Sequence, residues 1–366
     1  MTSEVAERLG VRHLAVLAQR ARPAGSPAER SARAYAAEVL TAAGFVAREK
    51  PFAYSEFPGR YATPLAGSLL AASIVTADVT AGRFGAVGAA SIALAGGVVA
   101  TMLFARLMFA SVLSFPWLRA DGVNLVATRG SAPTRVWLVA HLDSKSQPIP
   151  SLVRVMGVLL LVAGLALAGV ALAVTLGGHD IRTLWWGSLV ATLFGAVPVM
   201  LSVVGHQSDG AVDNASGAAT VLLAAAMLPT GTACGVLLTS AEELGLAGAR
   251  AWLGAQDAPC VVLNCDGVDD EGDVVIMFNG TMPPNVVNAL RAAAVGGARV
   301  RRMPLGLLTD SSAFSAAGWP AVTVSHGSLA TLRRIHTRRD TLANLNGTAI
   351  DRVAAILARA VEELAQ

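Results

Sequence analysis

The sequence predicts an α/β fold of three layers, in which a mixed, mostly parallel sheet lies between helices and is interrupted by two transmembrane α-helical hairpins. One observation is the alternation of strand-like and helix-like runs after residue 206, which is typical of a parallel sheet. Another is the low share of charged residues, 14%, where a soluble domain has about 25%. The mean hydropathy is +0.56, and we therefore expect part of the chain to lie in lipid.

The apolar runs that could cross a lipid bilayer occur in two pairs. A hydrocarbon core about 30 Å thick requires roughly 20 apolar residues per helix, and three uncharged runs meet this length. They are residues 84–105, 155–178 and 183–205. A fourth, shorter run at 63–79 contains Asp78, which we expect at the tip of a hairpin near Arg83. The pairing predicts hairpins at 61–115 and 151–205, and therefore an integral membrane protein with four spans.

The segments outside the hairpins are expected to form one α/β domain, because a two-pass insertion returns the chain to the side of the membrane that it left. These segments are residues 1–60, 116–150 and 206–366. Residues 26–45 have helical periodicity, with Ser26 as the expected N-cap. Strands are expected at 122–128, 135–141, 235–239, 260–265, 273–278 and 321–325, and later helices at 215–227, 243–254, 284–294 and 349–364.

Charge and cysteine content argue against a nucleic-acid-binding protein and against a protein stabilised by disulfides. The net charge is only +3 and the basic residues are scattered, without the basic stripe or stacking aromatics that bind nucleic acid. Cys234, Cys260 and Cys265 have no CxxC spacing and lie in apolar runs. This pattern argues against a disulfide framework and favours a reducing compartment.

The distribution of basic residues around the apolar runs predicts the orientation in the membrane. Lysines and arginines near the α/β segments outnumber those at the hairpin tips, where only Arg83 and Arg182 occur. Basic residues accumulate on the cytoplasmic side, so we expect the α/β domain in the cytoplasm. The charged N-terminal stretch, which does not read as a signal peptide, agrees with this orientation.

Polar side chains of the kinds that bind metals stand at the ends of the predicted strands and helices. His141 and Asp143 are two residues apart at a strand end and therefore share a face. The others are Asp213, the adjacent pair Glu242 and Glu243, Asp266 and His336. The carboxyl ends of strands are where open α/β sheets gather their ligand sites, and histidine with carboxylate is the donor set of a hydrolytic zinc site.

Each of these residues also has an ordinary structural interpretation when it is taken alone. His141 could be a hydrogen-bonded structural histidine, and Asp213 could cap the helix that follows it. The glutamate pair could begin an exposed helix, Asp266 could lie in a turn, and His336 could be a solvated loop residue. The metal-site interpretation depends on all of them occurring at element boundaries in one chain.

The motifs at these boundaries resemble the M-28 peptidases, the co-catalytic di-zinc aminopeptidases and their relatives. The resemblance covers nearly all of the chain outside the hairpins. It is carried by "RPAGSPAERSARAYAAEVLTAAGF", "HLD", "DNASG", "AEELGLAGARAW", "NCDGV", "TDSSAFSAAGWPAVTVS" and "HTRRDT". It implies a zinc-aminopeptidase-like sheet between helical layers and two Zn²⁺ ions as cofactors, for which other divalent transition metals could substitute.

The resemblance also implies a role for each residue. Asp213 would bridge both metals and be followed by a cis peptide bond to Asn214. Glu242 would be the general base, and Asp143 would orient the imidazole of His141. Asp310 and Ser311 would lie on the substrate side. His141 and Asp266 would complete one metal site, and Glu243 and His336 the other.

The function that follows from the resemblance is that of a membrane-anchored, zinc-dependent exopeptidase. It would hydrolyse the first peptide bond of a peptide substrate with a free N-terminus, by a metal-bridging hydroxide with Glu242 as base. Two alternatives stay open: a glutaminyl-cyclase-like acyltransferase with a single zinc, and a non-catalytic membrane scaffold with a relic peptidase domain. The sequence makes no prediction of the oligomeric state.

Overall fold

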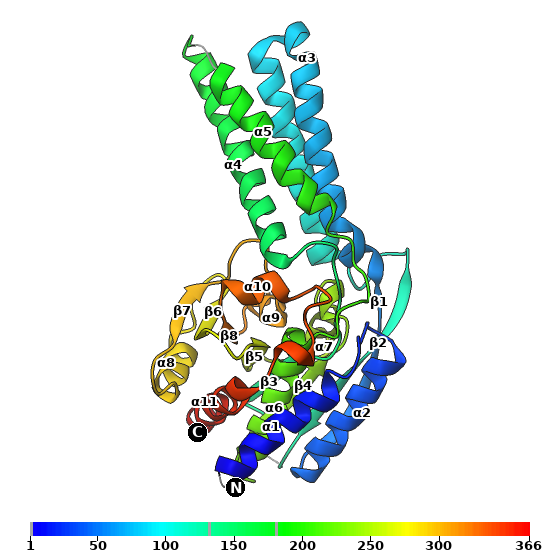
Figure 1. Cartoon of the computed structure of the whole chain (residues 1–366), viewed down its shortest axis with the longest axis vertical. Helices are drawn as coiled ribbons and strands as arrows, with labels where there is room; N and C mark the ends of the chain where they lie inside the picture. Colours follow the sequence, from blue (N-terminus) through cyan, green and yellow to red (C-terminus); the bar gives the residue numbers. More distant parts are fainter. Residues whose placement is uncertain (1–2, 131–132, 180–181) are drawn as a thin grey trace. The chain divides into compact units, whose positions relative to one another are not determined.

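The computed structural model describes residues 3–130, 133–179 and 182–366, with side chains from residue 9 onward. The chain forms two compact units, whose elements are labelled in Figure 1. The first, called the α/β unit below, comprises residues 1–54, 119–146 and 205–366. The second, the helical unit, comprises residues 55–118 and 147–204.

The α/β unit is built on one eight-stranded sheet with the order β1-β2-β4-β3-β5-β8-β6-β7. The central strands β4, β3, β5 and β8 run parallel, whereas β2 is antiparallel to β4 and β6 is antiparallel to β8. The predicted mixed, mostly parallel sheet is therefore confirmed. The strands are β1 (Val46–Ser55), β2 (Arg119–Thr128), β3 (Val136–His141), β4 (Cys234–Thr239), β5 (Val261–Val268), β6 (Asp273–Phe278), β7 (Arg299–Arg302) and β8 (Ala321–Gly327).

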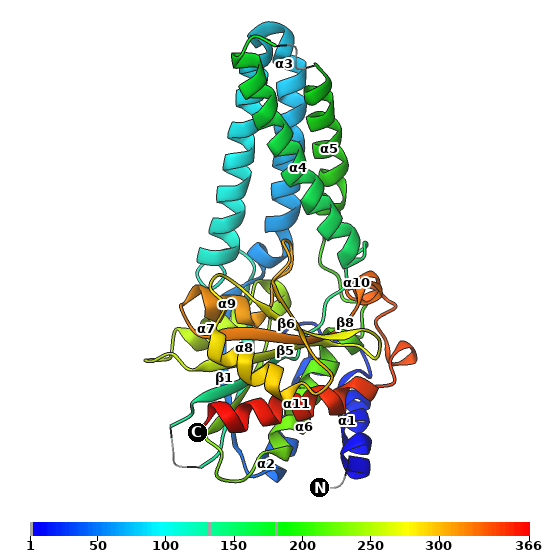
Figure 2. The ribbon, with the colours of Figure 1, turned by 90° about the vertical axis from the view of Figure 1, so that its left-hand side faces the viewer.

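Helices cover both faces of the sheet, which explains why its central strands read as continuous apolar runs. Leu138 of β3 packs into the core beneath α1 (Ser3–Leu17), α2 (Pro27–Ala42), α6 (Gly217–Met227), α8 (Pro284–Ala293) and α11 (Thr348–Leu364). Its neighbours Trp137 and Val139 point the other way, into a smaller core with α7 (Ala247–Leu253) and α9 (Asp310–Ala316). Figure 2 shows the resulting three layers edge-on.

The sequence predicted the start of α2 correctly but missed several short or exposed elements, for physical reasons. Ser26 caps α2 as predicted, because its hydroxyl accepts the main-chain N–H of Glu29. The edge strands β1 and β7 are largely exposed and interrupted by charged residues, so they lack the apolar pattern of a buried strand. The helices α9 and α10 (Leu329–Arg334) have seven and six residues, too few to show a helical period.

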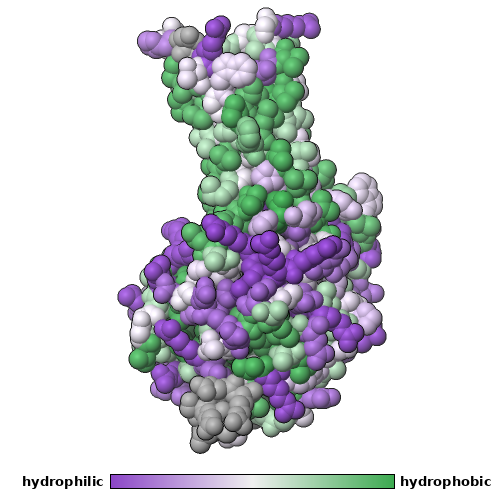
Figure 3. Space-filling model, viewed as in Figure 1, coloured by the Kyte–Doolittle hydropathy of each residue, from purple (hydrophilic) through white to green (hydrophobic). Residues whose placement is uncertain are grey.

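The helical unit consists of α3 (Glu56–Ala105), α4 (Ser151–Leu176) and α5 (Arg182–Met200), each long and apolar enough to cross a membrane. Helix α3 is broken at Gly85, whose φ of 68° and ψ of 179° are not helical. Ile74 and Ala77, before this break, pack against Ala89 and Ala93 after it, so α3 is a pair of antiparallel helices. The outer surface of this unit is largely hydrophobic in Figure 3.

Asp78 has a hydrogen-bond partner that the sequence did not indicate. We expected it near Arg83 at a hairpin tip, but its Oδ1 accepts the indole N–H of Trp185 at 3.0 Å. Arg83 instead lies over the ring of Phe84, 5.5 Å from its centroid. The carboxylate of Asp78 therefore joins α3 to α5 inside the helical unit.

Candidate metal centre

Six of the predicted side chains converge at the carboxyl ends of the central strands. β3 ends at His141, β4 leads into the short turn Glu242–Leu244, and β5 carries Asp266. Of the remaining two residues, Asp213 lies in the distorted π-helical turn Ala211–Ser216 before α6, and His336 lies after α10. Within the described residues, two groups could each hold a metal ion with ligand atoms within 4.8 Å of one another: His141, Glu242 and Asp266, and Asp213, Glu243 and His336.

Asp213 joins the two groups through its two carboxylate oxygens. Its Oδ1 lies 3.1 Å from Nε2 of His141, and its Oδ2 lies 2.8 Å from Nε2 of His336. One carboxylate thus faces a histidine on either side. This is the arrangement that a carboxylate bridging two metal ions requires.

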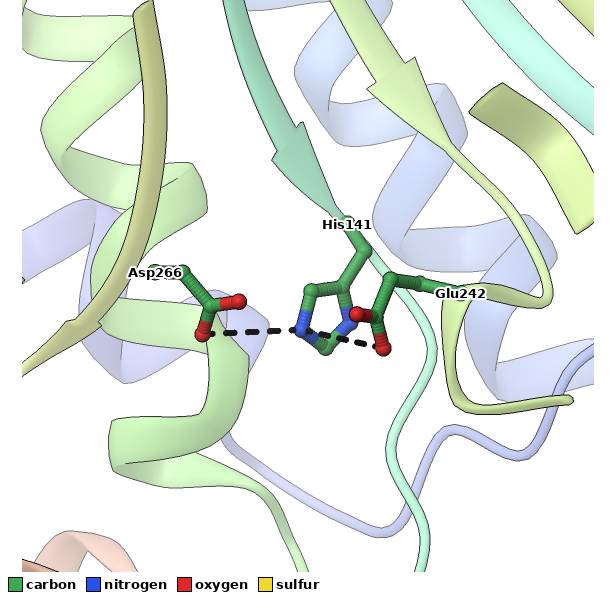
Figure 4. A group of neighbouring side chains, drawn as sticks. All are labelled: His141, Glu242 and Asp266. Atoms are coloured by element: carbon green, nitrogen blue, oxygen red, sulfur yellow. Dashed lines mark ion pairs between the residues drawn. The ribbon is translucent and has the colours of Figure 1, made fainter. Parts of the chain in front are cut away.

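The first group surrounds the ring of His141, as Figure 4 shows. Nε2 of His141 lies 3.9 Å from Oδ1 of Asp266 and also 3.9 Å from Oε2 of Glu242. Burial raises the pKa of Glu242 well above its usual range, against the opposing effect of His141. Burial also raises the pKa of Asp266. The environment of both carboxyl groups therefore favours their protonated forms.

A lysine that the sequence did not indicate lies beside the second group. Oε1 of Glu243 lies 3.3 Å from Nε2 of His336, while Oε2 lies 2.5 Å from Nζ of Lys145. Burial acts to raise the pKa of Glu243, but Lys145 and His336 outweigh it and hold this pKa at about 2. Glu243 is therefore an ionised carboxylate.

Asp143 contacts the first histidine and both glutamates through different groups. Nδ1 of His141 lies 3.0 Å from the main-chain oxygen of Asp143 and 3.6 Å from its carboxylate. A carbonyl oxygen only accepts, so Nδ1 carries the hydrogen and Nε2 is left as the ligand atom. The carboxylate of Asp143 accepts the main-chain N–H groups of Glu242 and Glu243, at 3.1 and 3.2 Å.

The turn Ala211–Ser216, which carries Asp213, is held by residues to which the sequence analysis assigned no role. The peptide bond from Asp213 to Asn214 is cis, as the resemblance implied. Oδ1 and Oδ2 of Asp340 accept the main-chain N–H groups of Val212 and Asp213, at 2.7 and 3.1 Å. The buried guanidinium of Arg22 donates to the main-chain oxygens of Leu142, Asp209 and Gly210. In the sequence, the only indication that Arg22 matters was its place in the "RP" that opens the first matching stretch.

The two residues expected on the substrate side lie in different surroundings. Oδ2 of Asp310 accepts a 2.5 Å hydrogen bond from the hydroxyl of Thr239. Burial raises the pKa of Asp310 to about 7, although His141 opposes the shift. The hydroxyl of Ser311 is fully buried in a network with those of Thr309 and Thr323. Hence Asp310 lies close enough to the cluster to interact with it, whereas Ser311 belongs to the packing of α9.

The donor set suits divalent cations on physical grounds. The centre collects four carboxylates and two imidazoles, all at most 14% exposed, with Lys145 as the nearest counter-charge. Oε1 of Glu243 is buried and, in the part of the chain that the structure describes, forms no hydrogen bond, although Nε2 of His336 lies 3.3 Å away. Buried carboxylates need a cation or hydrogen bonds to compensate for lost hydration, and zinc prefers this mixture of oxygen and nitrogen ligands.

Comparison with known proteins supports the fold and the family. Peptidase family M28 matches residues 124–361, which is more than half of the chain. No curated protein matches the chain in sequence.

Several solved structures share the fold at low sequence identity. The aminopeptidase from Aneurinibacillus sp. strain AM-1 has a TM-score of 0.58 and 16% identity over 98% of this chain and 94% of that one. A zinc aminopeptidase from Bacillus subtilis has a TM-score of 0.56 and 14% identity over 98% and 95%. The glutaminyl cyclase of Fimbriiglobus ruber has a TM-score of 0.53 and 13% identity over 98% and 95%. These structures show the shared fold, whereas the family match, whose residues include all six members of the cluster, shows that the chain belongs to peptidase family M28.

Proposed function

We propose that the protein is a membrane-anchored, zinc-dependent exopeptidase that hydrolyses the first peptide bond of peptides with a free N-terminus. The observation that carries this proposal is the placement of Asp213, with one carboxylate oxygen toward each histidine. His141 and Asp266 would hold one zinc ion, and Glu243 and His336 the other, with Asp213 shared between them. Bound there, zinc would polarise the scissile carbonyl and make a water molecule acidic enough to attack near neutral pH.

The protein's own residues would then move the proton. Glu242 lies beside His141 in the first group. With Asp213 shared, each zinc ion would already have three ligands without Glu242, which leaves this side chain free to act as the base. Its carboxylate would take a proton from the attacking water and deliver it to the leaving amine. Burial raises the pKa of Glu242, which lets this side chain hold the proton between the two steps.

A second candidate function is supported by Lys145. Because its ammonium group already binds Oε2 of Glu243, the chain could hold fewer than two metal ions. A glutaminyl-cyclase-like acyltransferase with one zinc would then be favoured. It would attack with the substrate's own amino group rather than with water.

One assay separates these functions. The full chain in detergent, stripped with a chelator and reloaded with zinc, is given aminoacyl-arylamides, their N-acetylated forms and a peptide with N-terminal glutamine. An exopeptidase releases arylamine from the free-amine substrates only and frees glutamine from the peptide. A cyclase instead releases ammonia and leaves the peptide bond intact. Absence of any turnover after zinc is reloaded would leave the non-catalytic scaffold as the conclusion.

The proposed anchor is the helical unit, with α3 counted as two spans around Gly85 and the α/β unit in the cytoplasm. Three of its helices have the length and composition of spans. Cys234 is fully buried and cannot report sidedness, but Lys50 on β1 is exposed. A membrane-impermeant amine reagent should label Lys50 in inverted vesicles and leave it unlabelled in right-side-out cells. The opposite pattern would place the α/β unit outside.

A further inference from the structure

Lys145 is an unusual residue in this chain because only two of its 28 basic residues other than histidine are lysines, Lys50 and Lys145. The Lys145 ammonium group lies within the metal centre, 2.5 Å from Oε2 of Glu243. The two side chains are 13% and 4% exposed, so water screens this pair little.

The main chain around Lys145 is fixed on both sides. The N–H of Ser144 donates to the main-chain oxygen of Arg22 at 2.9 Å, and the hydroxyl of Ser144 donates to the main-chain oxygen of Ser208 at 3.0 Å. The N–H of Ser146 donates to the main-chain oxygen of Gly205 at 2.9 Å. The lysine side chain therefore starts from a well-defined point, and its contact with Glu243 is built into the fold.

This cation makes the two halves of the metal centre unequal. In the second half, Lys145 compensates the charge of Glu243, and Oε1 is the oxygen left facing His336. In the first half, the carboxylate of Asp266 is paired with the expected ligand His141, and among the described residues it has no ion pair with a lysine or arginine. A lysine is a compact point charge, whereas an arginine would bind both carboxylate oxygens in a fork. Lysine can therefore hold one oxygen of Glu243 and leave the other available.

We propose that Lys145 competes with a divalent cation for Glu243, so that the site of Asp213, Glu243 and His336 holds zinc more weakly than the site of His141, Asp213 and Asp266. This inference rests on the proposed zinc-dependent function. Two positive charges a few ångströms apart in a poorly hydrated interior repel each other strongly. The second zinc ion therefore binds against the ammonium group, and its occupancy follows the zinc supply.

The test is a zinc titration of the full chain in detergent, after removal of metal, followed by calorimetry and by metal analysis of dialysed samples. The wild type should bind zinc in a tight and a weaker step. Lys145→Met should tighten the weaker step by at least about tenfold and leave the first within about threefold. Lys145→Gln, a second uncharged variant, should behave in the same way.

Matched variants keep the interpretation specific. Lys145→Arg retains the charge and should keep the weaker step weak, and Lys50→Met should titrate like the wild type. If the weaker zinc-binding step of Lys145→Met and Lys145→Gln were unchanged or weakened, the inference would be overturned. Lys145 would then only hold Glu243 in position. Hydrolysis of aminoacyl-arylamides by the same zinc-loaded samples judges the proposed function separately. A chain that binds no zinc at all would overturn both.

Discussion

His141 donates its Nδ1 hydrogen to the main-chain oxygen of Asp143, 3.0 Å away, rather than to the carboxylate of that residue. The carboxylate lies 3.6 Å from the same nitrogen, too far for a hydrogen bond. It accepts instead the main-chain N–H groups of Glu242 and Glu243. The backbone of Asp143 thus orients the histidine, and its side chain fixes the turn that carries the glutamates.

Asp143→Asn should therefore affect the glutamates more than the histidine. The amide can accept from only one of the two N–H groups, and the unpaired one costs about 1–3 kcal/mol of folding free energy. Displacement of Glu242 should lower turnover by about a hundredfold, while zinc binding by His141 persists. Thermal unfolding, zinc content and arylamide hydrolysis measure these effects, with the exposed Asp257→Asn as control. Loss of the tighter zinc ion would show that the carboxylate orients His141 after all.

Glu242 and Glu243 should respond differently to substitution although they are adjacent. Glu242→Gln removes the proton acceptor but keeps the shape of the side chain, so turnover should fall by about 10²–10⁴-fold with zinc content unchanged. Glu243→Ala removes a ligand and should lose the weaker zinc ion. Metal analysis and hydrolysis by the same samples distinguish the two, and Glu271→Gln on an exposed loop serves as control. Near-normal hydrolysis by Glu242→Gln would refute its role as the base.

His13 should make stability depend on pH away from the metal centre. Burial, with a smaller effect of Arg12, lowers the pKa of His13 from 6.5 to about 4, and its Nδ1 lies 2.7 Å from the hydroxyl of Tyr35. Above pH 6.5 the imidazole is neutral in the folded and unfolded chain. As the pH falls toward 4, the unfolded chain binds a proton that the folded chain does not, so stability decreases.

The size of this effect follows from the shift in pKa. The fall of the His13 pKa from 6.5 to about 4 corresponds to roughly 3 kcal/mol of stability, and this loss is complete once the pH is well below 4. Denaturant unfolding of the wild type and His13→Gln at several pH values isolates it, because the other titrating groups are common to both chains. The gap between their stabilities should change over this window. A constant gap would show that the pKa of His13 is the same in the folded and unfolded chain.

Glycine at position 164 should be required where α4 meets α5. A Cβ atom there would lie 2.3 Å from Oγ1 of Thr192 and 3.0 Å from its main-chain nitrogen, which cannot move aside cheaply. Gly164→Ala should therefore destabilise the helical unit by about 1–3 kcal/mol. Gly169→Ala on the same helix meets no atom within 4 Å and should be tolerated. Thermal unfolding in detergent measures both, and equal effects would contradict the close packing of these helices.

The clustering of these residues could be predicted from the sequence because they lie where strands and helices begin or end. The carboxyl ends of parallel strands meet at one edge of a sheet, so His141 and Asp266 could be placed together without coordinates. The contact of Lys145 with Glu243 depends on a side-chain conformation and on a turn held by distant hydrogen bonds. No local pattern contains that information. Arg22 is buried by residues more than a hundred positions away and was missed for the same reason.

The same contrast applies to the fold. Buried strands such as β3 were readable because both faces are apolar, whereas β7 consists of Arg299–Arg302 at the edge and reads as a loop. Asp78 was placed correctly on the first hairpin, but its partner Trp185 comes from the other hairpin. Pairings between segments distant in sequence are set by tertiary packing rather than by local composition.

The α/β unit closes across its second insertion by a pair of main-chain hydrogen bonds between Ser146 and Gly205, at 2.9 and 2.7 Å. Likewise β1, which leads into the first insertion, neighbours β2, which follows it. Each insertion therefore begins and ends at points that already touch. Short linkers could therefore replace both helical hairpins without opening the sheet, and the shortened chain would retain the whole metal-binding cluster.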